Sequence, residues 1–237
     1  LLDGQQIVVI ATGIKSKSSN GKTGGMIQTW ILLRDIDPRE ANKSGADYGI
    51  CGDCPHRGKA TTALDKVLAA ERTCYVILFQ APLNVWKTYH RGNYDRAVDS
   101  EAIASVGTGR KVRLGSYGDP AAVPAYVWQA LLSKSVGRTG YSHQSGLANA
   151  DFVADIMMVS ADNLAMAQGA WANGHRTFRV IDSVDDMDKN EVLCPASKEA
   201  GERTNCENCG LCAGSSIKAK SIAIVAHGNG AKYATTK

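Results

Sequence analysis

Cysteine is the residue type in this chain with the clearest chemistry, and its seven copies fall into two groups. Four lie within residues 194–212, and the other three, Cys51, Cys54 and Cys74, lie far upstream. Clustered thiolates are ligands for zinc and for iron–sulfur clusters. Because seven is an odd number, disulfides within the chain cannot pair them all. The two groups therefore predict two metal centres.

The C-terminal group has the spacing of a compact metal-binding run. Cys206, Cys209 and Cys212 are each separated by two residues, and Cys194 offers a fourth thiolate, with 11 residues between it and Cys206. Two intervening residues let successive thiolates converge on one metal centre. Gly210 relieves steric crowding where the backbone wraps closely around that centre. The run "CENCGLC" is similar in local ligand geometry to bacterial ferredoxins. We expect a 4Fe-4S cluster here, with a four-cysteine zinc site as the alternative.

The N-terminal group is sparser and leaves one ligand position open. Cys51 and Cys54 are separated by two residues, and Cys54 and Cys74 by 19. Three thiolates hold a 4Fe-4S cluster in which one iron accepts an exogenous ligand. One alternative is zinc with His56 or His90 as fourth ligand, and another keeps Cys74 as a core residue. We expect the chemistry at this open centre and an auxiliary or structural role for the C-terminal one.

Apolar runs that alternate with helical patterns must position these thiols. β-Branched and aromatic runs predict strands at 5–12, 26–33, 111–117, 138–143, 154–160, 175–181 and 221–228. Helical patterns begin at Pro82, at Pro120 after Asp119, and near Asp162. Strand–helix alternation with largely apolar strands is typical of a parallel sheet covered on both faces. Without a G-x-G-x-x-G after the first strand, a barrel fits better than a dinucleotide-binding fold.

The fold class expected is α/β, a partial (β/α)6 TIM-like barrel with an N-terminal hairpin and a cysteine-rich C-terminal insertion. We expect one domain over residues 1–237, in which 1–25 form a strand and loop. Residues 26–182 and 221–237 form the partial barrel, and 183–220 form the cluster-binding insertion. The run "CYVILF" at 74–79 is expected to close the cluster loop and not to form a strand of the barrel.

Polar side chains follow the carboxyl end of strand after strand, where such barrels gather their chemistry. The alternative is that each is an ordinary loop or cap residue, and Asp119 and Asp162 would be N-caps with or without a function. Their recurrence predicts that the rim lines a site. The residues at these ends are Ser116, Tyr117, Asp119, Tyr141, His143, Gln144, Ser160, Asp162, Arg179, Asp182 and His227.

Charge and hydropathy exclude several classes of partner. The chain has 27 Lys and Arg against 23 Asp and Glu, a net charge of +4, so we do not expect it to bind nucleic acid. The lysines of "GIKSKSSNGKTGG" are expected in a solvated flexible loop. No apolar run approaches the roughly 18 residues that a membrane span needs. We expect a cytoplasmic protein without a membrane partner.

The phrase "GSYGDP" ends the second barrel strand, and the cysteine trio follows the first. A partial (β/α)6 barrel with these features resembles the radical S-adenosylmethionine superfamily, in which the usual spacing is C-x3-C-x2-C. In that family the open iron chelates the amine and carboxylate of S-adenosylmethionine, and a glycine-rich motif contacts the amine. The resemblance implies that Gly118 and Asp119 bind this cofactor, and that Ser160 and Asp162 approach its ribose.

The same resemblance implies the side chains that face a substrate, namely Tyr141, His143, Arg179 and His227. It also gives residues 194–212 the role of an auxiliary cluster, as in C-terminal extensions of that family. The phrases "CGDCPHRG", "RLGSYGDPAAVP" and "KSIAIVAHG" are similar to a family of uncharacterised phage-encoded proteins. That second resemblance implies a viral origin and residence in the host cytoplasm.

We therefore expect a divergent radical S-adenosylmethionine-like enzyme that acts on a small molecule and takes electrons from a reductase or ferredoxin-type donor. One alternative is a two-cluster protein that transfers electrons or senses redox state without catalysis. Another is a zinc-stabilised binding module, and a metal-free barrel enzyme is the fourth. The acidic run at 182–188 offers a docking site for an electron donor, although a solvated loop explains it more simply.

Overall fold

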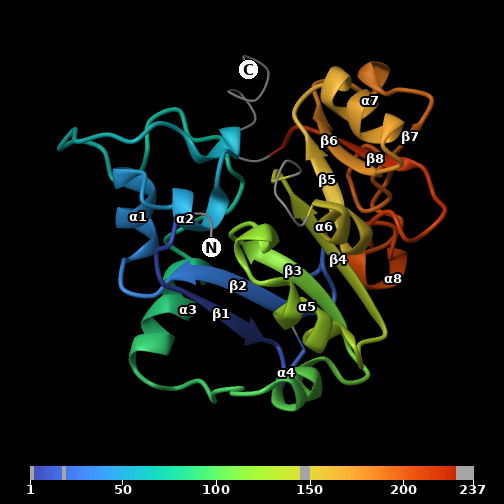
Figure 1. The fold of residues 1–237 in the computed structure, drawn as a ribbon. Helices are drawn as coiled ribbons and strands as arrows, with labels where there is room; N and C mark the ends of the chain where they lie inside the picture. The colour runs from blue at the N-terminus through green and yellow to red at the C-terminus, as the bar shows by residue number, and fades with distance from the viewer. Residues whose placement is uncertain (1–2, 18–19, 145–149, 228–237) are drawn as a thin grey trace.

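The chain folds around one mostly parallel sheet of eight strands in the order β1-β2-β3-β4-β5-β6-β8-β7 (Figure 1). The computed structural model describes residues 3–17, 20–144 and 150–227. β1 runs antiparallel to β2, and every other neighbouring pair is parallel. The strands are β1 (Ile7–Thr12), β2 (Ile27–Leu33), β3 (Lys111–Tyr117), β4 (Gly137–Ser142), β5 (Met158–Ala161), β6 (Thr177–Ile181), β7 (Glu191–Leu193) and β8 (Ser221–Val225).

The predicted α/β class and the N-terminal hairpin are confirmed. Ile7 of β1 pairs with Leu33 of β2, and the ladder continues to Thr12 opposite Gln28. All seven expected runs form strands, and residues 74–79 form none, as expected. The last residue of the run at 221–228 lies outside the described residues, and β7 was not expected.

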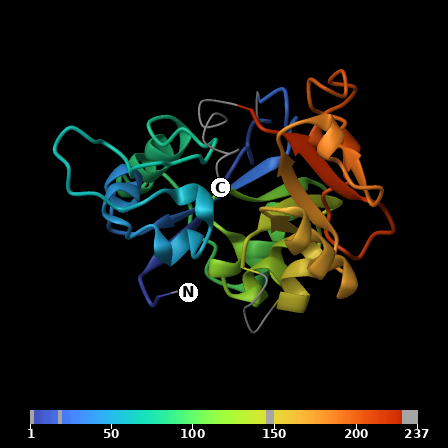
Figure 2. The same cartoon turned by 90° about the horizontal axis from the view of Figure 1, so that it is seen from above.

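Helices connect the parallel strands. The α-helices are α1 (Pro38–Ser44), α2 (Tyr48–Cys51), α3 (Ala81–His90), α4 (Ser100–Gly107), α5 (Ala125–Leu132), α6 (Ala150–Ile156), α7 (Leu164–Ala172) and α8 (Cys206–Cys209). The described residues also form the short 3-10 helices η1 (Pro55–Arg57), η2 (Pro120–Ala122) and η3 (Val184–Asp186). Seen from above, the blue-to-teal segment that carries α1–α3 lies on one side, and the yellow-to-red segment lies on the other (Figure 2).

Two expected element boundaries were wrong. The strand expected at 154–160 begins only at Met158, because Ala154 and Ile156 complete helix α6. A short apolar run fits a buried helix end as well as a strand, so the pattern alone does not separate them. The helix expected from Pro120 forms only the turn η2, and α5 starts at Ala125. Pro124 interrupts it, because proline has no amide hydrogen and restricts the residue before it.

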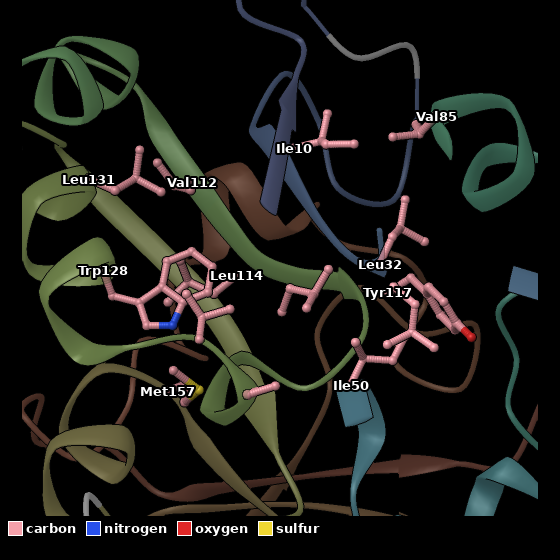
Figure 3. Close-up of a cluster of buried hydrophobic side chains, with 14 of the residues drawn as sticks. Ile10, Leu32, Ile50, Val85, Val112, Leu114, Tyr117, Trp128, Leu131 and Met157 are labelled. Atoms are coloured by element: carbon pink, nitrogen blue, oxygen red, sulfur yellow. The ribbon is translucent and has the colours of Figure 1, made fainter. Parts of the chain in front are cut away.

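The main hydrophobic core fills the space between strands β1–β4 and the helices that pack on them (Figure 3). Val112 and Leu114 of β3 are fully buried and face Trp128 of α5, whose indole donates a hydrogen bond to the Pro120 carbonyl at 2.9 Å. Each fully buried Leu or Val contributes about 1.5–3 kcal/mol. Because side chains alternate along a strand, Arg113 points to the opposite face of the sheet. Packing of Val112 and Leu114 in the core thus holds β3 in place, and polar residues lie on the opposite face of the strand.

Gly118, which follows β3, is required by packing against β2. Its φ is +80°, and a Cβ atom there would lie 2.7 Å from both the Cβ and the carbonyl oxygen of Ile31. No other residue type combines this backbone conformation with so close an approach. The structure therefore accounts for Gly118 without any bound cofactor.

Replacing Gly118 with alanine should lower the free energy of unfolding far more than replacing Gly92, a matched control. Both have positive φ, so each alanine costs about 1–2 kcal/mol in backbone strain. Gly92 has no atom within 4 Å of its added Cβ, whereas Gly118→Ala must also displace β2, at about 1–3 kcal/mol more. Denaturant unfolding of the two variants measures the difference, and equal losses would contradict the packing explanation.

Candidate metal centres and the site between them

The loop that carries Cys51 and Cys54 is built around a buried ion pair. Arg57 donates to Asp47 Oδ1 from Nε at 3.0 Å and from Nη2 at 2.6 Å, and the Asp47 side chain is 2% exposed. Arg57 Nη1 also donates to the Gly52 carbonyl at 3.0 Å. The pair therefore closes the loop on itself, with Cys51 at the end of α2 and Cys54 at the start of η1.

Cys74 joins this loop through backbone hydrogen bonds. The amides of Thr73 and Cys74 both donate to the His56 carbonyl, at 3.2 and 3.0 Å. The three cysteines are close enough to interact, because burial first, and then negative charge on Asp47, Cys54 and Cys74, raises the pKa of Cys51. The predicted N-terminal trio thus comes together from residues 51–54 and 74.

The C-terminal cysteines also converge, around the short helix α8. The Asn205 side chain caps α8 by accepting from the Asn208 amide at 3.0 Å, and Gly210 ends the helix with φ of 67°. Burial, Cys194, Cys206 and Cys209 all raise the pKa of Cys212, and the Tyr141 hydroxyl lowers it, so that it reaches about 12. These four thiols therefore form a second interacting group.

The N-terminal loop packs over this second group. The Cys206 amide donates to the Lys22 carbonyl at 2.9 Å, and the Gly25 amide donates to Glu207 Oε2 at 2.7 Å. The Lys22 ammonium lowers the pKa of Cys206, against a larger rise from burial. The expectation of a solvated loop agrees with the exposure of Asn20, Gly21 and Lys22, but it is wrong for Thr23, which is 1% exposed, and for Gly25, which is buried. Residues 18–19 lie outside the described part of the chain.

All seven cysteines are free thiols, so none is held in a disulfide and each is available as a metal ligand. A zinc ion with Zn–S bonds of about 2.3 Å holds its thiolates about 3.8 Å apart. Across residues 3–17, 20–144 and 150–227, no three cysteine sulfurs lie within 4.8 Å of one another. A four-iron cube spreads its thiolates more widely than a single ion.

Asp119 holds the ends of two strands together. Its carboxylate accepts hydrogen bonds from the Ala121 amide at 2.9 Å, the Ser142 hydroxyl at 2.7 Å and the His143 amide at 2.8 Å. Burial raises the pKa of Asp119, although these hydrogen bonds lower it. The expected N-cap role of Asp119 is confirmed at η2. The carboxylate of Asp119, which the sequence predicted to bind a cofactor, therefore connects the segments after β3 and β4 by hydrogen bonds.

His143 and Asp162 meet beside the N-terminal trio. His143 Nε2 lies 3.2 Å from Asp162 Oδ1, and His56 Nε2 lies 3.6 Å from the same oxygen. Burial lowers the pKa of His143, but hydrogen bonds to Asp162 and Cys54 outweigh burial and raise it to about 10. The N-cap of α7 is Asn163, so Asp162 is not needed as a cap.

The other predicted site residues lie elsewhere. Tyr141 hydrogen-bonds to Cys212 and so belongs to the C-terminal group, and its ring contacts that of Phe178 in a tilted arrangement with centroids 4.5 Å apart. Arg179 forms a buried ion pair with Glu191 at 2.6 Å, which explains its burial without a substrate. His227 Nε2 lies 3.1 Å from the Lys22 ammonium, and Ser160 is buried in β5.

Arg113 is a site residue that sequence reasoning missed. Its Nη2 donates to the Tyr75 hydroxyl at 2.7 Å, and Tyr75 directly follows Cys74. The same guanidinium interacts with Tyr141 and lowers the pKa of Cys206. It therefore lies between the two cysteine groups. A charged residue in the apolar strand "KVRLGSY" was the signal that could have found it.

Within residues 3–17, 20–144 and 150–227, the structure contains no helix with the length and apolar character needed to cross a membrane. A scan against protein-family models, and searches of curated proteins and of solved structures, found no match to this chain.

Asp47→Asn should destabilise the protein by about 3 kcal/mol or more, because it leaves Arg57 without its partner in a largely buried loop. Asp35→Asn is the matched control, since the Arg34–Asp35 pair is exposed and should contribute little. Urea unfolding measures both. A loss of stability no greater for Asp47→Asn than for Asp35→Asn would show that the loop does not depend on this pair.

Proposed function

We propose that this protein is an iron–sulfur enzyme of radical S-adenosylmethionine type with two 4Fe-4S centres. The observation that carries the proposal is the division of seven free thiols into an interacting trio and an interacting quartet. The trio Cys51, Cys54 and Cys74 leaves one iron open for a ligand, whereas the quartet closes its centre. The open centre is the reactive one and the closed centre is auxiliary.

The sheet order supports a partial (β/α)6 barrel as the scaffold. Strands β2, β3, β4, β5, β6 and β8 are parallel neighbours that follow chain order. The trio follows the first of these strands, and the segments after β3, β4 and β5 reach it through Asp119, Gln144 and Asp162. Active sites of such barrels lie at these carboxyl ends. The cysteine-rich segment 183–220 is then an insertion before the last strand.

When bound at the trio, the cluster and S-adenosylmethionine would supply reductive cleavage of the cofactor and a radical for hydrogen abstraction. The chain's own residues give the site its shape. The Asp119 carboxylate accepts a hydrogen bond from the His143 amide, and the Asp119 amide donates to the Ile50 carbonyl at 2.6 Å. We propose Asp119 as a positioning residue, and His143 as the side chain nearest to a small-molecule substrate.

A two-cluster electron-transfer protein is the second candidate function. Arg113 favours it, because it donates a hydrogen bond to Tyr75, next to Cys74, and its charge interacts with Cys206 of the other group. Both candidates need a reductase or ferredoxin-type donor, and they differ in whether S-adenosylmethionine is consumed. The zinc-stabilised module is the remaining candidate, and it differs from both in needing no electron donor.

Anaerobic reconstitution should give a brown protein with about eight iron and eight sulfide per chain. Cys54→Ser should remove about half of this content by opening the trio, and Cys209→Ser should remove the other half. Each variant is the control for the other. A colourless protein with stoichiometric zinc would contradict both iron–sulfur candidates. If only one of the two variants loses iron and sulfide, the proposal of a second cluster is wrong.

Reduced, reconstituted protein should convert S-adenosylmethionine to 5′-deoxyadenosine. Cys54→Ser should abolish this product, because the open iron is lost, while Cys209→Ser should retain it at least in part. Chromatography of the nucleoside after dithionite reduction measures the product. Reversible cluster reduction with the cofactor left intact would favour the electron-transfer candidate instead.

Tyr141→Phe should lower the reduction potential of the C-terminal cluster and leave the N-terminal one unchanged. The Tyr141 hydroxyl hydrogen-bonds to Cys212, and hydrogen bonds to cluster sulfurs stabilise the more negative reduced state. Tyr126→Phe is the control, because Tyr126 is 60% exposed on α5. Redox titration followed by electron paramagnetic resonance separates the two centres, and an equal shift of both potentials would contradict the assignment.

A further inference from the structure

Two imidazoles and one carboxylate from three different segments meet beside the cysteine trio. His56 comes from η1, His143 follows β4 and Asp162 follows β5. Their ligand atoms all lie within 4.8 Å of one another, and they are the only such group of potential metal ligands in the part of the chain that is described. Polar residues that are neighbours on one loop often lie close together by chance. These three residues come from segments far apart in the sequence, so the fold itself brings them together.

The distances are those of a coordination shell. His143 Nε2 and His56 Nε2 lie 3.2 and 3.6 Å from Asp162 Oδ1. Ligands at about 2.1 Å from one ion are about 3.0 Å apart in octahedral geometry and about 3.4 Å apart in tetrahedral geometry. An ion could therefore be bound with only small side-chain adjustments.

The two histidines are oriented by other groups. His56 Nδ1 lies 2.7 Å from the Thr73 hydroxyl, which leaves Nε2 directed at Asp162. Asp119 fixes the backbone of His143, and the two rings stand edge to face with centroids 5.5 Å apart. Metal-binding histidines characteristically use the second ring nitrogen in this way, because it fixes the tautomer and the ring direction.

We propose that His56, His143 and Asp162 bind a divalent transition-metal ion, such as zinc or ferrous iron, separately from the cysteine centres. Imidazole with carboxylate selects these ions over magnesium or calcium. Three protein ligands leave positions for water or a substrate oxygen, as in catalytic sites and unlike closed structural ones. This inference goes beyond the iron–sulfur proposal and stands whatever the cysteines hold.

Cobalt tests the site, because Co²⁺ occupies nitrogen and oxygen sites and reports its ligands by absorbance. Equilibrium dialysis of the reconstituted full chain should show about one Co²⁺ beyond the iron already bound. The bound Co²⁺ should lack the thiolate-to-metal charge-transfer band that a cysteine site gives. His143→Asn and Asp162→Asn should each remove this equivalent, with iron and sulfide content unchanged. His90→Asn is the matched control, since His90 lies on α3 against the Arg34 carbonyl.

Thr73→Val gives a milder second variant that keeps the shape of the buried side chain. It should weaken cobalt binding about 10- to 100-fold, because His56 loses the group that orients it. Two outcomes would overturn the proposal: no cobalt lost in folded His143→Asn, or a thiolate charge-transfer band in the cobalt-bound protein. A changed cluster resonance in His143→Asn does neither, because His143 also hydrogen-bonds to Cys54. Bound cobalt reports on the proposed histidine–aspartate site, and iron and sulfide content reports on the clusters. The two proposals can therefore fail independently of each other.

Discussion

The carboxylate of Asp119 is the constraint on which the arrangement of the site depends. It is 7% exposed, and it joins the turn after β3 to the end of β4 through three hydrogen bonds. Its own amide donates to Ile50, one residue before Cys51. A buried carboxylate is costly unless its hydrogen bonds are satisfied, so the segments that satisfy it are held in place together. The positions of His143 and of the cysteine loop both follow from it.

Burial also determines how the cysteines behave as ligands. It raises the pKa of Cys51, Cys74, Cys194, Cys206 and Cys212. The thiols therefore keep their protons near neutral pH until a metal displaces them, and metal affinity rises with pH as the proton is released more easily. The Arg113 guanidinium opposes this effect at Cys206, where its positive charge favours the thiolate.

Much of the scaffold could be predicted, because apolar runs and turn residues are local signals. The strand positions, the hairpin and the absence of a strand at 74–79 follow from such patterns. The boundary at Met158 could not, since a short apolar run suits a helix and a strand equally. Cysteine spacing indicated both thiol groups. The partners of Arg57 and Arg179 depend on three-dimensional packing, so the sequence did not separate the substrate-facing residues from those in ion pairs.

The contact between the N-terminal loop and α8 has a consequence for the order in which the molecule is assembled. The Gly25 amide and the Glu207 carboxylate are 182 residues apart in the chain. At a synthesis rate of about 5–20 residues per second, about 10–40 s separate their emergence from the ribosome. During this time the N-terminal loop lacks its contact with α8. The loop can cover the C-terminal cysteines only after residue 207 has been made, so under the proposed function their metal would be delivered after the earlier parts of the sheet have been synthesised.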